Sequence, residues 1–221
     1  MHRNDILDAL AGYQEVWSYA AGHGAPYVDA RESAVLRRFV EFIRATPGAF
    51  ERTALEGHLT GSAVVVSADL TRVLLTLHGK LNKWLQLGGH ADGHPHLQDV
   101  AMREAEEESG LTGLKFLPFG HAIFGAASNL TDMFHRPVPM DLDCHDIPAR
   151  PGEPTHVHYD VRYLIVADAN KPLVISEESK DLRWFSLDEA RRVAPEASTL
   201  RQFDKLDWLR PRLTGGGKVL G

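Results

Sequence analysis

Cysteine is nearly absent from this 221-residue sequence, which contains only Cys144. A single cysteine cannot form an internal disulfide, so the fold must depend on a hydrophobic core, which a chain of this length can build. We expect a reducing, cytoplasmic setting, because chains without disulfides are typical of that compartment. The first residues also lack the basic and then apolar layout of a secretory signal, which agrees with this expectation.

Long apolar runs and an excess of basic residues are missing as well. No stretch reaches the ~18 consecutive apolar residues of a membrane helix, so we expect no membrane-spanning segment. The 24 Lys and Arg against 30 Asp and Glu give a formal net charge of −6, which argues against a nucleic-acid partner. Histidine, in contrast, is abundant, with 12 residues, and directs attention to metal or phosphate chemistry.

Hydrophobic periodicity divides the chain into a helical start and a mixed remainder. Apolar residues at three- and four-residue spacing predict two helices before position 57, the second over about 31–45. After position 57, short aliphatic runs with turn signals between them alternate with helical segments. We therefore predict an α/β sandwich with a mixed sheet and an N-terminal helical extension, divided into an extension at 1–56, a main domain at 57–210 and a flexible tail at 211–221.

Several later elements follow from local signals. Residues 114–124 are apolar enough for a strand, whereas 125–154 has little periodicity and is expected to be a long loop with at most a short strand. Ser186 and Glu189 have the spacing of a capping box at a helix start. A last helix is expected over about 196–209.

The clearest helix, over about 96–109, carries an unusual acidic face. Glu104, Glu107 and Glu108 stand at i, i+3 and i+4, so their carboxylates leave the same side of the helix. Like charges at this spacing destabilise a helix, and anions toward its C-terminal end oppose the macrodipole. A divalent cation such as Mg²⁺, or alternatively Mn²⁺, would remove both penalties. On the glutamates alone, a solvated acidic surface is the favoured interpretation.

The residues around these glutamates resemble the signature of the Nudix hydrolase family. Gly89 is followed at the family's spacing by Arg103-Glu104, then Glu107-Glu108, and then Gly110-Leu111. The match spans twenty-three positions, with Pro95 in place of the first glutamate of the signature. The segments before and after it also resemble the family's usual flanks. The resemblance implies a Nudix-type α/β/α sandwich for residues 57–210.

The resemblance also implies a set of site residues. The metal ligands would be Gly88, through its carbonyl, and Glu104, Glu107 and Glu108. Glu107 and Arg103 would belong to the catalytic machinery, with Arg103 orienting the glutamates and the loop. In the family the usual partner of this arginine is the first signature glutamate, a role that the Pro95 side chain cannot fill. Arg103 therefore needs another partner, for which Asp92 and Asp99 are the candidates.

A separate catalytic base in this family often comes from an acidic loop well after the signature. Glu178, six residues before Trp184, stands in such a stretch and is our candidate ahead of Glu177. An acidic surface loop with no catalytic role would have the same composition.

A second polar pattern follows position 155. His156, His158, Asp160 and Arg162 alternate with apolar residues, which places the four polar side chains on one face of a strand. We interpret His156, His158 and Arg162, together with His90 in the signature loop, as substrate-binding residues. A transition metal held by the imidazoles, or histidines with a purely structural role, are the alternatives.

Together with these patterns, the resemblance to the Nudix family implies a Mg²⁺-dependent pyrophosphohydrolase acting on a nucleoside diphosphate linked to another group. The alternative is a Nudix-fold nucleotide-binding or regulatory module that has lost turnover, which Pro95 would favour and the three retained glutamates would oppose. We also predict a homodimer, because many members of the family pair and because Trp17, Phe39 and Phe42 add bulky apolar surface outside the main domain. The alternative is that the apolar stripes of the first two helices cover one side of the sheet.

Overall fold

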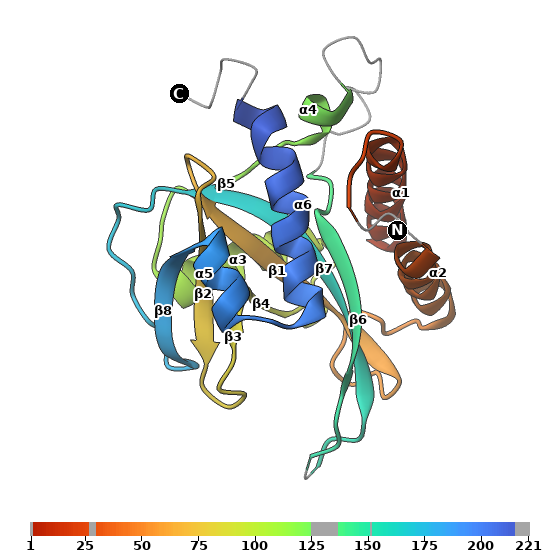
Figure 1. Ribbon diagram of the computed structural model, residues 1–221. Helices are drawn as coiled ribbons and strands as arrows, with labels where there is room; N and C mark the ends of the chain where they lie inside the picture. The colour runs from red at the N-terminus through yellow and green to blue at the C-terminus, as the bar shows by residue number, and fades with distance from the viewer. Residues whose placement is uncertain (1, 27–29, 125–136, 151, 215–221) are drawn as a thin grey trace.

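The computed structural model describes residues 2–26, 30–124, 137–150 and 152–214 (Figure 1). The helices are α1 (His2–Ala21), α2 (Ala30–Ala45), α3 (Leu97–Ser109), α4 (Gly120–Phe124), α5 (Leu187–Val193) and α6 (Ala197–Thr214). The strands are β1 (Gly57–Ser67), β2 (Arg72–His78), β3 (Trp84–Leu85), β4 (Leu87–His90), β5 (Lys115–Phe116), β6 (Asp141–Ile147), β7 (His156–Ala167) and β8 (Ser179–Ser186).

One mixed sheet organises the molecule, and β1 lies at its centre. Along one edge β1 pairs in parallel with β7 over its whole length. Along the other edge it pairs antiparallel with β4 and then with β2. β6 is antiparallel to β7, and β8 is antiparallel to β2. Every residue of β1 is buried, as expected for a strand covered on both faces.

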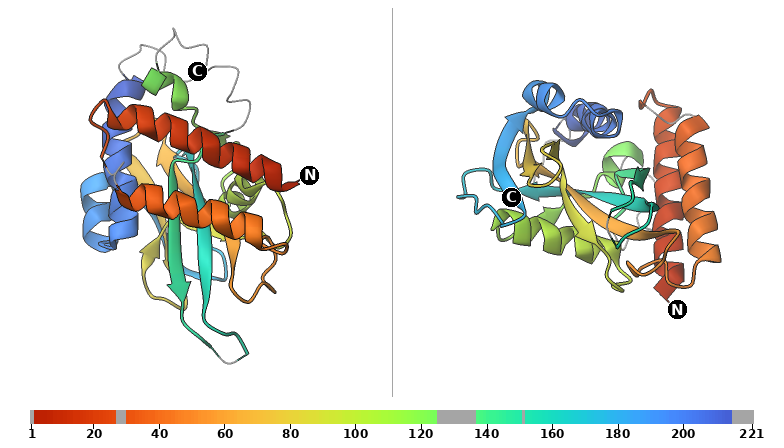
Figure 2. Two further views of the ribbon diagram at one scale, coloured as in Figure 1. Left: turned by 90° about the vertical axis from the view of Figure 1, so that its right-hand side faces the viewer. Right: turned by 90° about the horizontal axis from the view of Figure 1, so that it is seen from below.

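Helices cover both faces of this sheet. The view from below in Figure 2 shows α3 on one side and α5 and α6 on the other, with α1 and α2 side by side next to β6. The predicted α/β sandwich with an N-terminal helical extension is therefore confirmed.

The close packing of α3 on β1 depends on Gly61. A Cβ at this position would lie 2.6 Å from the carbonyl oxygen of Leu97, in the first turn of α3. Because side chains alternate along a strand, the neighbours Thr60 and Ser62 face the opposite side of the sheet. β1 therefore presents its small residue to α3 and its polar residues to the α6 side.

The N-terminal helices complete the core of the same chain. The apolar stripe of α1 is buried, with Trp17 only 1% exposed, and Phe39 and Phe42 of α2 are 0% and 7% exposed. These side chains therefore do not supply exposed bulky surface, and this reason for expecting a homodimer is wrong.

Other local predictions have mixed outcomes. The capping box of Ser186 and Glu189 is present at the start of α5. The 114–124 segment is not one strand, because only Lys115–Phe116 pairs with β7 and α4 follows. The 125–154 segment contains β6 from Asp141, whereas 125–136 lies outside the described residues. The last helix continues to Thr214, so the first residues of the expected tail are helical.

Within the described residues, no helix is both long enough and apolar enough to cross a membrane.

Candidate active site

The acidic face of α3 lies against the glycine turn of β4. A Cβ on Gly89 would lie 2.4 Å from the carboxyl carbon of Glu104, so a side chain at this position would displace that carboxylate. The backbone N–H of Gly88 donates a hydrogen bond to Oε2 of Glu108 at 3.1 Å. The two glutamates, one turn apart, are thus both held against the same short piece of backbone.

Burial and neighbouring charges make these two carboxyl groups unusual. Burial, with added repulsion from Glu104 and Glu178, raises the pKa of Glu108 to about 7, although the Gly88 N–H acts in the opposite direction. Burial is also the main cause that raises the pKa of Glu104, with Glu107 and Glu178 adding repulsion. Desolvated carboxylates that repel one another are the environment in which a hard divalent cation is most stabilising.

Glu178 lies in the loop before β8, and this loop lies beside the acidic face of α3. Its carbonyl accepts a hydrogen bond from the N–H of Gly79 at 2.8 Å, which fixes the loop to the end of β2. The exposed side chain is close enough for its charge to act on both Glu104 and Glu108. Sequence reasoning could identify the acidic stretch, but only the tertiary structure brings it to α3.

Arg103 forms ion pairs with two glutamates of α3 in place of the signature glutamate that this chain lacks. Its Nη2 lies 2.9 Å from Oε1 of Glu104, and its Nη1 lies 3.3 Å from Oε2 of Glu107. Among the described residues, neither of the aspartates that we considered pairs with it. Asp92 instead accepts a hydrogen bond from Nη2 of Arg52 at 2.7 Å.

Glu107 is therefore less enclosed than its two neighbours. Its side chain is 60% exposed, against 16% for Glu104. Within the described part of the chain, the one set of three potential ligands whose ligand atoms all lie within 4.8 Å of one another consists of histidines, not of these glutamates. A cation shared by all three glutamates would require Glu107 to turn away from Arg103.

The predicted substrate-binding histidines lie on the opposite face of β4 from Glu104. Because residues alternate along a strand, His90 points away from α3 while its neighbour Gly89 faces it. Its ring lies 4.9 Å from that of His58 and 5.0 Å from that of His158. Burial, with the nearby imidazoles, lowers the pKa of His58 to about 4 and that of His158 to about 2. His58 had not been singled out in the sequence.

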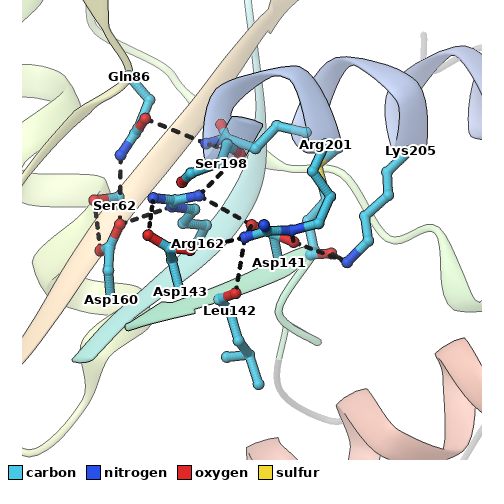
Figure 3. Close-up of polar contacts among 12 residues, drawn as sticks. Ser62, Gln86, Asp141, Leu142, Asp143, Asp160, Arg162, Ser198, Arg201 and Lys205 are labelled. Carbon is cyan, nitrogen blue, oxygen red and sulfur yellow. Dashed lines mark hydrogen bonds and ion pairs between the residues drawn. The ribbon is translucent and has the colours of Figure 1, made fainter. Parts of the chain in front are cut away.

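Arg162 occupies a closed network of ion pairs in the interior (Figure 3). Its side chain is 3% exposed and lies 2.7 Å from Asp160, 3.0 Å from Asp141 and 3.4 Å from Asp143. From α6, Arg201 bonds the same two β6 aspartates. The predicted substrate contact by Arg162 does not fit this placement, because its donors are already used by carboxylates.

A groove of about 500 Å³ lies elsewhere, between α1 and α2. Trp17, Glu32 and Arg37 are among its lining residues, which include none of the predicted site residues.

Comparison with protein families shows to which family the chain with this site belongs. A family model described as the NUDIX domain matches residues 57–208, more than half of the chain. The chain belongs to the NUDIX domain family. Membership supports the predicted class of enzyme, a Nudix-type pyrophosphohydrolase, and the signature that begins at Gly89 lies inside the matched segment.

The chain is similar to several solved structures. A NUDIX-family hydrolase from Clostridium perfringens is 25% identical, covers 69% of this chain and 97% of its own, and superposes with a TM-score of 0.52. An Ap4A hydrolase from C. elegans in a binary complex is 16% identical, with coverages of 67% and 94% and a TM-score of 0.48. The NUDIX domain of Shewanella oneidensis NrtR, complexed with ADP ribose, is 15% identical, with coverages of 76% and 96% and a TM-score of 0.46. No curated protein sequence matches the chain significantly.

Within the Nudix fold, the described geometry brings together most of the signature. Gly88, Gly89, Glu104 and Glu108 are in direct contact, and Arg103 bridges Glu104 to Glu107. The residue that sequence reasoning missed here is Arg52, which precedes β1 and holds Asp92 of the signature loop. No local pattern around Arg52 predicts this contact, because its partner is 40 positions away.

Proposed function

We propose that this Nudix chain hydrolyses a phosphoanhydride bond in a nucleoside diphosphate linked to another group, with a bound divalent cation. The observation that carries the proposal is the contact of Glu104 and Glu108 with the Gly88–Gly89 backbone. It places two half-buried carboxylates beside the two central glycines of β4, which have no side chains to obstruct a ligand. The chemistry of these donors fits Mg²⁺, with Mn²⁺ as an alternative, because both ions prefer oxygen ligands.

The ligands in this proposal are Glu104, Glu108, the carbonyl of Gly88 and, after a side-chain rotation, Glu107. The bound cation would neutralise charge on the diphosphate and lower the pKa of a water molecule. Arg103 would hold Glu104 in position through its ion pair. Its contact with Glu107 would be released when that carboxylate turns to the cation. Glu178 is proposed as the base that takes the proton of the attacking water, since its charge already acts at the carboxylate pair.

A covalent route has no support among the residues near the site. Burial raises the pKa of Cys144, the single cysteine, to about 12, so its thiol stays protonated and is a poor nucleophile. The proposed reaction is therefore direct attack by water. The cytoplasm is the setting that we expect for it, and a homodimer, which sedimentation velocity would test, stays a prediction.

The test is phosphate or nucleotide release from a panel of dinucleotide polyphosphates, nucleotide sugars, ADP-ribose and nucleoside triphosphates, with Mg²⁺ and with chelator. We expect hydrolysis of at least one diphosphate-containing compound only with the metal. Glu104→Gln and Glu108→Gln should each lower kcat/KM by about 100-fold or more, because each removes a ligand charge.

Glu106→Gln is the matched control. Glu106 is exposed on the same helix but outside the i, i+3, i+4 face, so its substitution should leave turnover unchanged. Wild-type rates in Glu108→Gln would contradict the metal assignment. Nucleotide binding without turnover across the whole panel would favour the regulatory module instead.

A further inference from the structure

Five histidines gather on the face of the sheet opposite α3. They come from four strands: His58 of β1, His90 of β4, His145 of β6, and His156 and His158 of β7. Strand register brings them together, because His58 is paired with His158 and His145 is paired with His158 from the other side. Neighbouring ring centroids lie 4.7 to 5.3 Å apart.

Three of these rings already have nearly the spacing of a metal site. One ring nitrogen from each of His58, His156 and His158 lies within 4.8 Å of the other two. The Nε2 atoms of His156 and His158 are 3.3 Å apart. Two nitrogens bound to one tetrahedral zinc at about 2.0–2.1 Å must be about 3.3–3.4 Å apart, so this pair needs no movement. The third nitrogen would have to approach by at most about 1.5 Å, which a ring rotation can supply.

His58 provides a second, independent observation. Its side chain is 2% exposed, and neither ring nitrogen has a hydrogen-bond partner within the described structure. A buried polar group without a partner costs on the order of 1–3 kcal/mol, so a ligand that bonds this ring would remove a penalty present in the free protein. The His58 ring is surrounded by other imidazoles, and clustered imidazoles commonly bind a metal ion.

Outer contacts orient His156, one of the three rings, and the neighbouring ring of His145. Nδ1 of His156 lies 2.9 Å from the carbonyl oxygen of Pro154, to which it can only donate, so Nε2 of the neutral ring keeps its lone pair. Nδ1 of His145 lies 3.3 Å from Oδ2 of Asp143. Carbonyl and carboxylate acceptors of this kind commonly orient metal-binding histidines.

We propose that His58, His156 and His158 bind a transition-metal ion of the zinc class, separate from the cation held by the glutamates. Imidazole nitrogens select Zn²⁺, Ni²⁺, Co²⁺ or Cu²⁺ over the hard ions that carboxylates prefer. Three protein ligands leave a fourth position. Its candidates are His90, whose ring lies 4.9 Å from that of His58, and Glu153, whose Oε1 lies 3.7 Å from Nε2 of His156. The site would cross-link β1 to β7 and, through His90, support the strand that carries Gly88 and Gly89.

The experiment uses tag-free protein stripped with chelator and then dialysed against Zn²⁺ in the presence of excess Mg²⁺. Bound zinc is counted by elemental analysis, and affinity is measured by competition with a chromophoric chelator. We expect one zinc per chain, a higher Tm with zinc than with chelator, and a tetrahedral absorption spectrum with Co²⁺. His156→Asn and His158→Asn should weaken binding by about 100-fold or more.

Two controls keep the result interpretable. His23→Asn removes an exposed histidine at the end of α1, outside the cluster, and should bind zinc as the wild type does. The double variant Glu104→Gln/Glu108→Gln should also keep the zinc, so this proposal and the proposed hydrolysis can fail separately. Stripped wild-type protein that is folded and binds no zinc, or histidine variants that bind it with wild-type affinity, would overturn the site.

Discussion

At the scale of single residues, Glu108 shows how burial changes the chemistry of a carboxyl group. The side chain is partly buried beside Glu104, which disfavours its charged form, although the carboxylate accepts a hydrogen bond from the Gly88 N–H. The pKa is therefore raised to about 7. In the metal-free protein, the folded state holds a proton on this group at pH values at which the unfolded chain has released it.

This difference predicts a pH-dependent stability. The pKa of Glu108 is about 7 in the folded state and 4.5 in the unfolded chain. The contribution of Glu108 to the free energy of unfolding is therefore favourable below pH 4.5 and is lost as the pH rises to about 7. With chelator present, the free energy of unfolding of the wild type, relative to Glu108→Gln, should fall by about 1–3 kcal/mol between pH 4.5 and 8. Urea unfolding at the two pH values measures it. An equal pH dependence in both proteins would show that Glu108 is not perturbed.

At the scale of secondary structure, the contact between α3 and β1 sets where the acidic face lies. The helix approaches the strand so closely that backbone atoms of α3 occupy the space that a side chain at position 61 would need. The backbone of a helix cannot move locally to make room for an added Cβ, as a flexible side chain can. The position of Glu104 and Glu108 relative to β4 therefore depends on a residue that takes no part in the chemistry.

Gly61→Ala tests this dependence. The added Cβ, 2.6 Å from the Leu97 carbonyl oxygen, should displace α3 and cost about 1–3 kcal/mol in the free energy of unfolding. Because the displaced helix carries the glutamates, Mg²⁺-dependent hydrolysis should fall as well. Gly48→Ala is the control: its Cβ would meet no atom within 4 Å, and its effect should stay within about 0.5 kcal/mol. Equal stability of the two variants would contradict the packing argument.

At the scale of the whole molecule, a buried network of charges joins the helical extension to the Nudix domain. Lys205 of α6 is fully buried; its Nζ lies 2.8 Å from Asp141 of β6 and also bonds Glu32 of α2. The same ammonium donates to Tyr13 of α1 at 3.0 Å and lies 4.4 Å from the ring centroid of Trp17. The extension is thus bonded, through Lys205, to the last helix and to the sheet.

Lys205→Met should therefore destabilise the entire chain. The substitution keeps the approximate volume but leaves Glu32 and Asp141 without this cation, which should cost about 3–5 kcal/mol in the free energy of unfolding. The matched change Lys83→Met breaks an ion pair with Glu196 in which the lysine side chain is 56% exposed, and should cost less than about 1 kcal/mol. Urea unfolding of both variants compares them. A cost for Lys205→Met as small as that for Lys83→Met would show that the buried network contributes little.

Patterns within one element could be predicted from the sequence because their causes lie within a few residues. The i, i+3, i+4 spacing places Glu104 beside Glu108, and Gly110 ends the helix in a left-handed conformation, as expected for a C-terminal glycine. The Ser186–Glu189 capping box is equally local. The segment over 114–124 was mispredicted because its apolar residues are compatible with a strand and with a short helix.

The sequence by itself determined the Nudix signature, the acidic face of α3 and the polar alternation along β7. Only the tertiary structure decided what those polar residues meet, because the register of parallel strands depends on packing between segments 100 positions apart. The same alternation that sends His156 and His158 toward His58 sends Arg162 into a closed ring of aspartates. Neighbours in sequence thus acquire different roles, since the partner of a side chain in the core is set by which strand lies beside it.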